Sequence, residues 1–175
     1  MDFSSSQWFL ELYKLIVLYM LNRVDFPLTQ SQISDFILEQ EYTNYLTLQQ
    51  AISQLAEAGL VQTHHTRNRT VLSITQEGKD TLGHFKGRIS AAIKKDIDAY
   101  FKEHSLELRN QVSVTSTYYK TTNGEFEALL SARDHDTTLV EIKLSVPTAE
   151  LADSICNNWT KKNQEVYEAL TKMLF

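Results

Sequence analysis

Apolar residues in the first sixty positions recur at helical spacing, and short polar breaks divide them into three segments. In residues 6–23 they cover most of the helix circumference, which predicts a helix buried on several sides, including against a second subunit. Thr-x-x-Gln boxes at residues 29–32 and 47–50 predict the starts of two further helices. The last of these, residues 47–58, is expected to end at Gly59 in a left-handed cap.

A β-hairpin is predicted directly after these helices. Residues 60–66 and 70–75 are β-like, and apolar and polar residues alternate in the second run as a half-buried strand requires. The sequence Arg-Asn-Arg at residues 67–69 joins the two runs. A helical pattern then extends over residues 76–101, where Gly83 and Gly87 either interrupt the helix or permit close approach of another one.

The second half of the chain changes to a period of two. Residues 111–120, 125–133 and 138–146 each alternate apolar and polar positions, with turn sequences between them, and residues 148–175 are helical again. This pattern predicts a three-stranded antiparallel sheet packed against a C-terminal helix.

The expected fold class is therefore α+β, with three parts along the chain. Residues 1–80 form an N-terminal winged helix-turn-helix, because the order is helix, helix, helix, hairpin, helix. Residues 81–105 form a connecting helix, and residues 106–175 form an α+β module for sensing or dimerisation.

Composition is that of an ordinary globular protein, with 42% hydrophobic and 22% charged residues in 175. The single cysteine, Cys156, excludes an internal disulfide framework and is interpreted as a small buried hydrophobe on the last helix. No signal peptide or membrane span is recognised, so we expect a cytoplasmic protein without a membrane partner.

The net charge of −5 conceals a local excess of basic residues. Residues 60–95 contain seven Lys or Arg and two Asp or Glu, so the rest of the chain has ten of its 17 basic and twenty of its 22 acidic residues. Local charge matters more than the total for binding nucleic acid. The basic segment contains the predicted hairpin.

Residues 56–82, AEAGLVQTHHTRNRTVLSITQEGKDTL, resemble the end of the recognition helix, the wing and the closing strand of bacterial winged-helix regulators. Ala58-Gly59-Leu60 and the Thr-x-x-Gly sequence at residues 75–78 occupy the matching places. The resemblance covers about residues 7–85. The whole chain also resembles an uncharacterised bacterial winged-helix family catalogued as a domain of unknown function.

This resemblance implies a DNA-binding transcriptional regulator whose recognition helix, residues 47–58, enters the major groove of double-stranded DNA. The wing, residues 61–75, would lie on the phosphate backbone. The residues expected to contact DNA are Thr47, Gln49, Gln50, Ser53 and Gln54 on the helix, Arg67, Asn68 and Arg69 at the wing tip, and Lys79 beyond it. The helix carries no Arg or Lys, which gives the wing more importance, and we expect a homodimer to supply enough contacts.

Three other interpretations stay open. The winged helix could serve protein–protein contact, and the C-terminal module could hold a small-molecule effector. Glu141-Ile142-Lys143, with Glu127, Asp134 and Asp136 upstream, weakly resembles a metal-dependent nuclease core.

No other set of residues suggests a catalytic, cofactor or metal site. His64 and His65 are adjacent on a strand and point to opposite faces, so they cannot chelate one ion together. We therefore expect a contact surface and no enzymatic activity.

Overall fold

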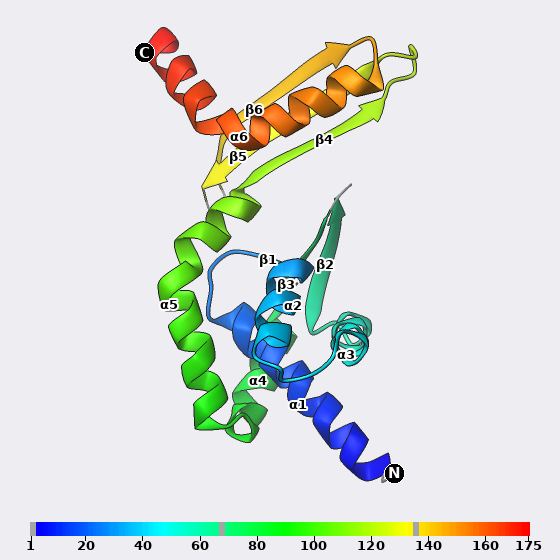
Figure 1. Cartoon of the computed structure of the whole chain (residues 1–175), viewed down its shortest axis with the longest axis vertical. Helices are drawn as coiled ribbons and strands as arrows, with labels where there is room; N and C mark the ends of the chain where they lie inside the picture. Colours follow the sequence, from blue (N-terminus) through cyan, green and yellow to red (C-terminus); the bar gives the residue numbers. More distant parts are fainter. Residues whose placement is uncertain (1–2, 67–68, 135–136) are drawn as a thin grey trace. The chain divides into compact units, whose positions relative to one another are not determined.

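The computed structural model describes residues 3–66, 69–134 and 137–175, and the chain divides into two compact units (Figure 1). Unit 1 is Met1–Arg109 and unit 2 is Asn110–Phe175. Unit 1 combines helices with a small three-stranded sheet, and unit 2 is a three-stranded antiparallel sheet packed against the C-terminal helix. The predicted α+β class is confirmed.

Helix α1 (Phe3–Asn22) passes through the core of unit 1. Its central residues are buried against α3 (Tyr45–Glu57) and α4 (Gln76–Phe85), in a core that also includes side chains of α2 (Gln30–Glu39). Burial on several sides is expected for a helix that is apolar around most of its circumference. The fully buried members on α1 include Ile16, Val17, Leu18 and Met20.

The two predicted capping boxes have different outcomes. Thr29 caps α2, because its hydroxyl accepts from the Gln32 amide at 3.0 Å and the Gln32 side chain accepts from the Thr29 amide at 2.8 Å. The predicted start of the next helix at Thr47 is wrong. Asn44 caps α3 instead, since its side chain accepts from the Thr47 amide at 2.9 Å, so the helix begins at Tyr45.

The sheet of unit 1 has the order β1-β3-β2. Strands β2 (Val61–Thr66) and β3 (Arg69–Ile74) form the predicted antiparallel hairpin. Strand β1 (Leu28–Thr29) was not predicted, because two residues are too few to show a period; it pairs with β3 and adds the buried Leu28 to the core.

The helical pattern after the hairpin is interrupted. Helix α4 (Gln76–Phe85) is followed by a single 3₁₀ turn, η1 (Lys86–Arg88), and then by α5 (Ala91–Ser113). The turn contains Gly87, and the extended backbone at Ile89 separates it from α5. Gly87 therefore lies at an interruption of the helix.

Helix α5 is joined by polar contacts to the segments that follow α1 and α2. The Tyr42 hydroxyl donates to Asp96 Oδ2 at 2.7 Å, and the Arg23 guanidinium pairs with Asp98 at 2.7 Å. The ring of Tyr100 lies 4.7 Å from that of Phe36. These contacts explain why unit 1 includes almost all of α5.

Unit 2 consists of β4 (Val114–Lys120), β5 (Phe126–Asp134), β6 (Thr137–Val146) and α6 (Ala149–Leu174). The strands form an antiparallel sheet in the order β4-β5-β6, as predicted. The predicted strand at residues 111–113 is wrong, because α5 continues through Ser113. The turn expected at residues 134–136 falls partly on His135 and Asp136, which lie outside the described residues.

Helix α6 covers one face of this sheet (Figure 1). Ala128 and Leu130 of β5 pack against Cys156 and Trp159 of α6, and the Trp159 indole donates to the Ser131 carbonyl at 3.3 Å. The prediction that Cys156 is buried is confirmed.

Candidate nucleic-acid interface

One backbone carbonyl joins the end of α3, the base of the hairpin and the start of α4. The Leu60 carbonyl accepts from the Thr75 amide at 3.1 Å and from the Thr75 hydroxyl at 3.0 Å, and that hydroxyl also donates to the Gly59 carbonyl at 2.8 Å. The Gly78 amide donates in turn to the Thr75 hydroxyl at 3.0 Å, which caps α4. We call these four residues the Leu60 junction.

The junction explains why glycine stands at two of its positions. Gly59 has φ +70°, a left-handed conformation that other residues adopt with strain. At Gly78, a Cβ atom would lie 2.1 Å from the Leu60 carbonyl oxygen, so any side chain would force the backbone to move. The Thr-x-x-Gly sequence is therefore the means by which α4 packs against the hairpin base.

The outward side of α3 is polar and uncharged over most of its length. Gln50 and Ser53 are exposed, and Gln54 is half-buried. The Ser53 hydroxyl donates to Glu57 one turn later at 3.2 Å, while Thr47 is half-buried in the first turn. Amide and hydroxyl groups are suited to hydrogen bonds with base edges.

Gln49 is placed differently from its neighbours. It is half-buried, and its side-chain carbonyl accepts from the side chain of Gln30 on α2. Its own amide nitrogen is buried without a hydrogen-bond partner among the described residues. Among the predicted helix contacts, the side chain of Gln49 is therefore directed toward α2 and already bonded there.

Two exposed residues at the start of α3 were not predicted as part of the site. Tyr45 is 54% exposed and Leu46 is 79% exposed, both in the first turn of the helix. In a helix-turn-helix, the N-terminal residues of the recognition helix reach the bases. The signal in the sequence is Asn44, a strong cap residue, which competes with the Thr47 box for the helix start.

The hairpin tip is only partly described. Arg67 and Asn68 lie outside the described residues, and Arg69 is the first residue of β3, paired across the hairpin with Thr66. The ring of His65 contacts the Thr70 hydroxyl at 3.0 Å. Within the ranges that the structure describes, no three His, Cys, Asp or Glu residues are grouped to hold a metal ion.

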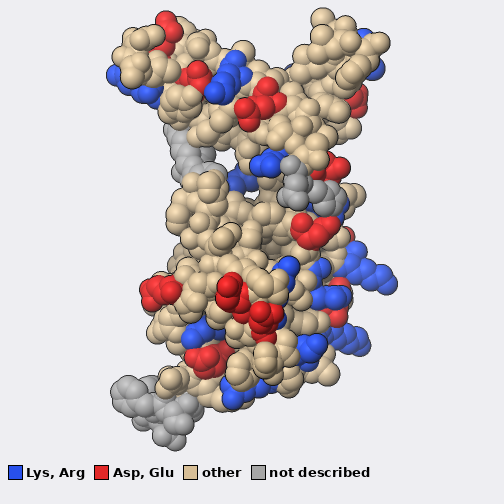
Figure 2. Space-filling view, turned by 180° about the vertical axis from the view of Figure 1, so that it is seen from behind, with Lys and Arg blue, Asp and Glu red and all other residues tan. Residues whose placement is uncertain are grey.

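Beyond the hairpin, the Lys and Arg residues of the basic segment, residues 60–95, lie at the two ends of α4. Lys79 is exposed in the first turn of α4, next to the Leu60 junction. Lys86, Arg88 and Lys94 lie after α4, at its far end from the hairpin. Figure 2 shows Lys and Arg side chains projecting on the side of unit 1 where η1 and α5 lie, with Asp and Glu among them.

Glu127 of unit 2 forms contacts with the strands on either side of β5. Lys143 Nζ lies 3.8 Å from Glu127 Oε1, and the Tyr119 hydroxyl donates to the same carboxylate. This hydrogen bond raises the pKa of Tyr119. Residues alternate across a strand, so Glu127 and its contacts lie on the face of the sheet opposite to Ala128 and α6.

The fold and this surface define a two-unit α+β protein with a winged-helix arrangement in its N-terminal unit. The chain belongs to the DUF4364 family, described as a domain of unknown function, whose family model matches residues 13–174. That match spans both units. No curated protein and no solved structure matches the chain. Among the described helices, none is both long enough and apolar enough to cross a bilayer.

Proposed function

We propose that the protein is a DNA-binding transcriptional regulator that places α3 in the major groove and the β2–β3 hairpin on the phosphate backbone. The observation that carries this proposal is the Leu60 junction. It ties the end of α3 to the base of the hairpin, so that the two elements are presented to a partner as one block. A helix and a wing in fixed relation are what groove binding requires.

Within this block, Gln50, Ser53 and Gln54 read bases through amide and hydroxyl groups. Tyr45 and Leu46 extend the same surface to the helix N-terminus, where a Tyr hydroxyl can reach a phosphate and an apolar side chain can contact a thymine methyl group. Arg67, Arg69 and Lys79 neutralise phosphates, and each such contact adds to the salt dependence of binding.

A homodimer is part of the proposal. Three phosphate contacts from one copy give little affinity at physiological salt, and two copies on related half-sites double them. We expect half-sites about one helical turn apart in the preferred duplex.

The test is the salt dependence of binding to duplex DNA, measured by fluorescence anisotropy. Because each lost phosphate contact reduces the slope of log affinity against log salt by about 0.9, Arg67→Ala with Arg69→Ala should flatten it by about 2 per subunit. Lys161→Ala with Lys162→Ala is the matched control, since it removes the same charge from exposed positions on α6. Equal slopes for the two double variants would refute wing contact.

Base reading has a separate test. Selection of preferred duplexes from a random pool should give a different sequence preference for Gln50→Ala than for the unchanged protein. If both proteins select the same sequences, α3 is not the reading element.

A second candidate function is protein–protein recognition by the same surface. It is favoured by the absence of Lys and Arg from α3 together with the exposure of Leu46, an apolar side chain at the helix start. Failure of the protein to bind any duplex at low salt would favour this candidate over the first.

A further inference from the structure

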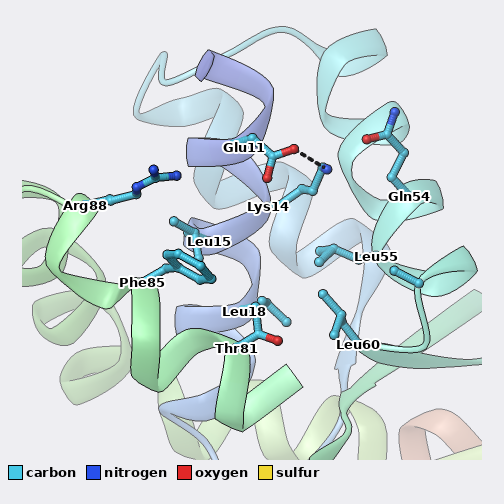
Figure 3. Close-up of a pocket in the computed structure, with 11 residues that line it drawn as sticks. Glu11, Lys14, Leu15, Leu18, Gln54, Leu55, Leu60, Thr81, Phe85 and Arg88 are labelled. Atoms are coloured by element: carbon cyan, nitrogen blue, oxygen red, sulfur yellow. Dashed lines mark hydrogen bonds and ion pairs between the residues drawn. The ribbon is translucent and has the colours of Figure 1, made fainter. Parts of the chain in front are cut away.

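Unit 1 contains a cleft of about 140 Å³ bounded by α1, α3, α4 and η1 (Figure 3). Its apolar side is formed by Leu15, Leu18, Leu55 and Leu60. Phe85 of α4 lies beside Leu15, and Arg88 extends from η1 toward α1. The volume is close to that of apolar protein cavities of about 150 Å³ that accept a benzene molecule.

Two polar groups at this cleft have unused hydrogen-bonding capacity. The Arg88 guanidinium lies 5.3 Å from the centroid of the Phe85 ring and has no hydrogen bond or ion pair with any described residue. The side-chain amide of Gln54 likewise has no hydrogen bond within the described part of the chain. Both groups carry N–H donors.

The charged side chains that line the cleft have a net charge of +1. Lys14 and Arg88 contribute two positive charges, and Glu11 contributes one negative charge. Lys14 and Glu11 form an ion pair at 2.7 Å, so the remaining positive charge is that of Arg88, which no carboxylate of the described residues pairs with. A ligand with a single negative charge would balance it.

We propose that this cleft binds a small monocarboxylate whose apolar body is about the size of one six-membered ring. The carboxylate accepts two parallel hydrogen bonds from Arg88, the geometry in which guanidinium and carboxylate bind most strongly. The apolar body lies against the leucine side chains and Phe85. An apolar wall with few convergent polar groups is typical of small-molecule sites.

Occupancy of the cleft would regulate DNA binding, and this part rests on the proposed function. The cleft is lined on α3 by Gln54, Leu55 and Ala58, so a ligand contacts the helix proposed to enter the major groove. The apolar body of a ligand held by Arg88 lies against Leu55 and Ala58, which belong to the segment proposed to read bases. The ligand should therefore lower the affinity for the preferred duplex.

The test uses benzoate as the probe and isothermal titration calorimetry of the full chain without DNA. Benzoate should bind at least tenfold more tightly than benzyl alcohol, which has the same ring and no charge. Arg88→Met should weaken benzoate binding at least tenfold. Lys86→Met is the matched control, because Lys86 is exposed on the same turn, does not line the cleft, and should leave affinity unchanged.

A second variant tests the location without removing charge. Ala58 is exposed at the end of α3 and lines the cleft, so Ala58→Leu should fill it, abolish benzoate binding and leave the melting temperature of the free protein within a few degrees. Absence of benzoate binding to the unchanged protein would overturn the proposal, and so would an unchanged benzoate affinity in Arg88→Met or in Ala58→Leu.

Duplex affinity measured with and without benzoate separates the two proposals. Benzoate binding without any duplex binding refutes the proposed function and supports the site. Duplex binding that benzoate does not weaken refutes the regulatory part, and duplex binding by a protein that does not bind benzoate supports the proposed function alone.

Discussion

The two units bury their side chains in different ways. The core of unit 1 is continuous from α1 to α5 and includes fully buried residues on nearly every element. The core of unit 2 is centred on four buried residues between one face of the sheet and α6. A single sheet with one covering helix is close to the smallest arrangement that can be stable. The stability of unit 2 therefore depends on few buried side chains, whereas the stability of unit 1 is distributed over many.

The exposed polar side chains of the two units also differ. In unit 1 the candidate surface stands on helices and a hairpin held by a large core, so its geometry is fixed independently of any partner. In unit 2 the face opposite to α6 carries Tyr119, Glu127 and Lys143. Glu127 contacts both of the other two side chains. Substitutions that separate the stability of the two units test this comparison.

The largest effect is expected from Trp159→Ala in unit 2. Removal of a buried Trp typically costs about 3–5 kcal/mol, which is a large part of the stability of a small unit. Hydrogen exchange of the full chain should show loss of amide protection in β4–α6 and retained protection in α1–α3. Simultaneous loss in both units would show that they unfold together.

The other tryptophan provides the control. Trp8 is 51% exposed on α1, so Trp8→Ala removes an equal side chain that is far less buried than Trp159. Its effect on the free energy of unfolding should stay within about 1 kcal/mol.

The next effect is expected at the Leu60 junction. Gly78→Ala places a methyl group against the Leu60 carbonyl and should destabilise unit 1 by about 1–3 kcal/mol. Gly83→Ala on the same helix meets no atom within 4 Å, and should stabilise by about 0.5–1 kcal/mol through helix propensity. Urea denaturation of both variants measures the difference, and equal midpoints would contradict the proposed packing of α4.

A smaller effect distinguishes the two residues that could start α3. Asn44→Ala removes the cap and should cost about 1 kcal/mol in the free energy of unfolding. Thr47→Ala should cost less, because only its backbone amide takes part in the cap. The reverse order in urea denaturation would restore Thr47 as the helix start.

The smallest effect concerns alkaline pH. Burial first, and then the hydrogen bond to Asp96, raises the pKa of Tyr42 above its ordinary value of 10.0, and burial also raises the pKa of Tyr100. Their contribution to stability is complete below pH 10 and is lost as the pH rises through the folded-state pKa. Tyr42→Phe should therefore make the fall in urea midpoint above pH 10 shallower, measured from pH 8 to 11. An unchanged fall would exclude Tyr42 as a cause.

Elements defined by neighbouring residues could be predicted from the sequence. The Thr29 box and the alternation in the hairpin each depend on a few consecutive residues, and both were confirmed. The start of α3 was wrong because two local caps overlap, and the side chain of Asn44 takes the amide of Thr47. The prediction that residues 111–113 belong to a strand was wrong because they fit the alternation of β4, the strand that follows, although they form the end of α5.

Contacts between distant segments could not be predicted. Tyr42 and Asp96 are 54 positions apart, and no local pattern marks either of them as a partner. The same holds for Gln49, which helical spacing places outward but which the packing of α2 turns toward Gln30. The exposure of Gln50 and Ser53 follows from α3 alone, so periodicity was sufficient there.

The Leu60 junction also bears on the order in which the chain folds. Its defining bond joins residues 15 positions apart, whereas the contact of α5 with Tyr42 closes a loop of 54 positions. Shorter loops cost less entropy to close, so the block of α3, hairpin and α4 can assemble before α5 docks. During synthesis this block is complete while unit 2 is still to be translated. The proposed DNA-contacting part therefore forms from a contiguous stretch of chain, without waiting for the rest of the protein.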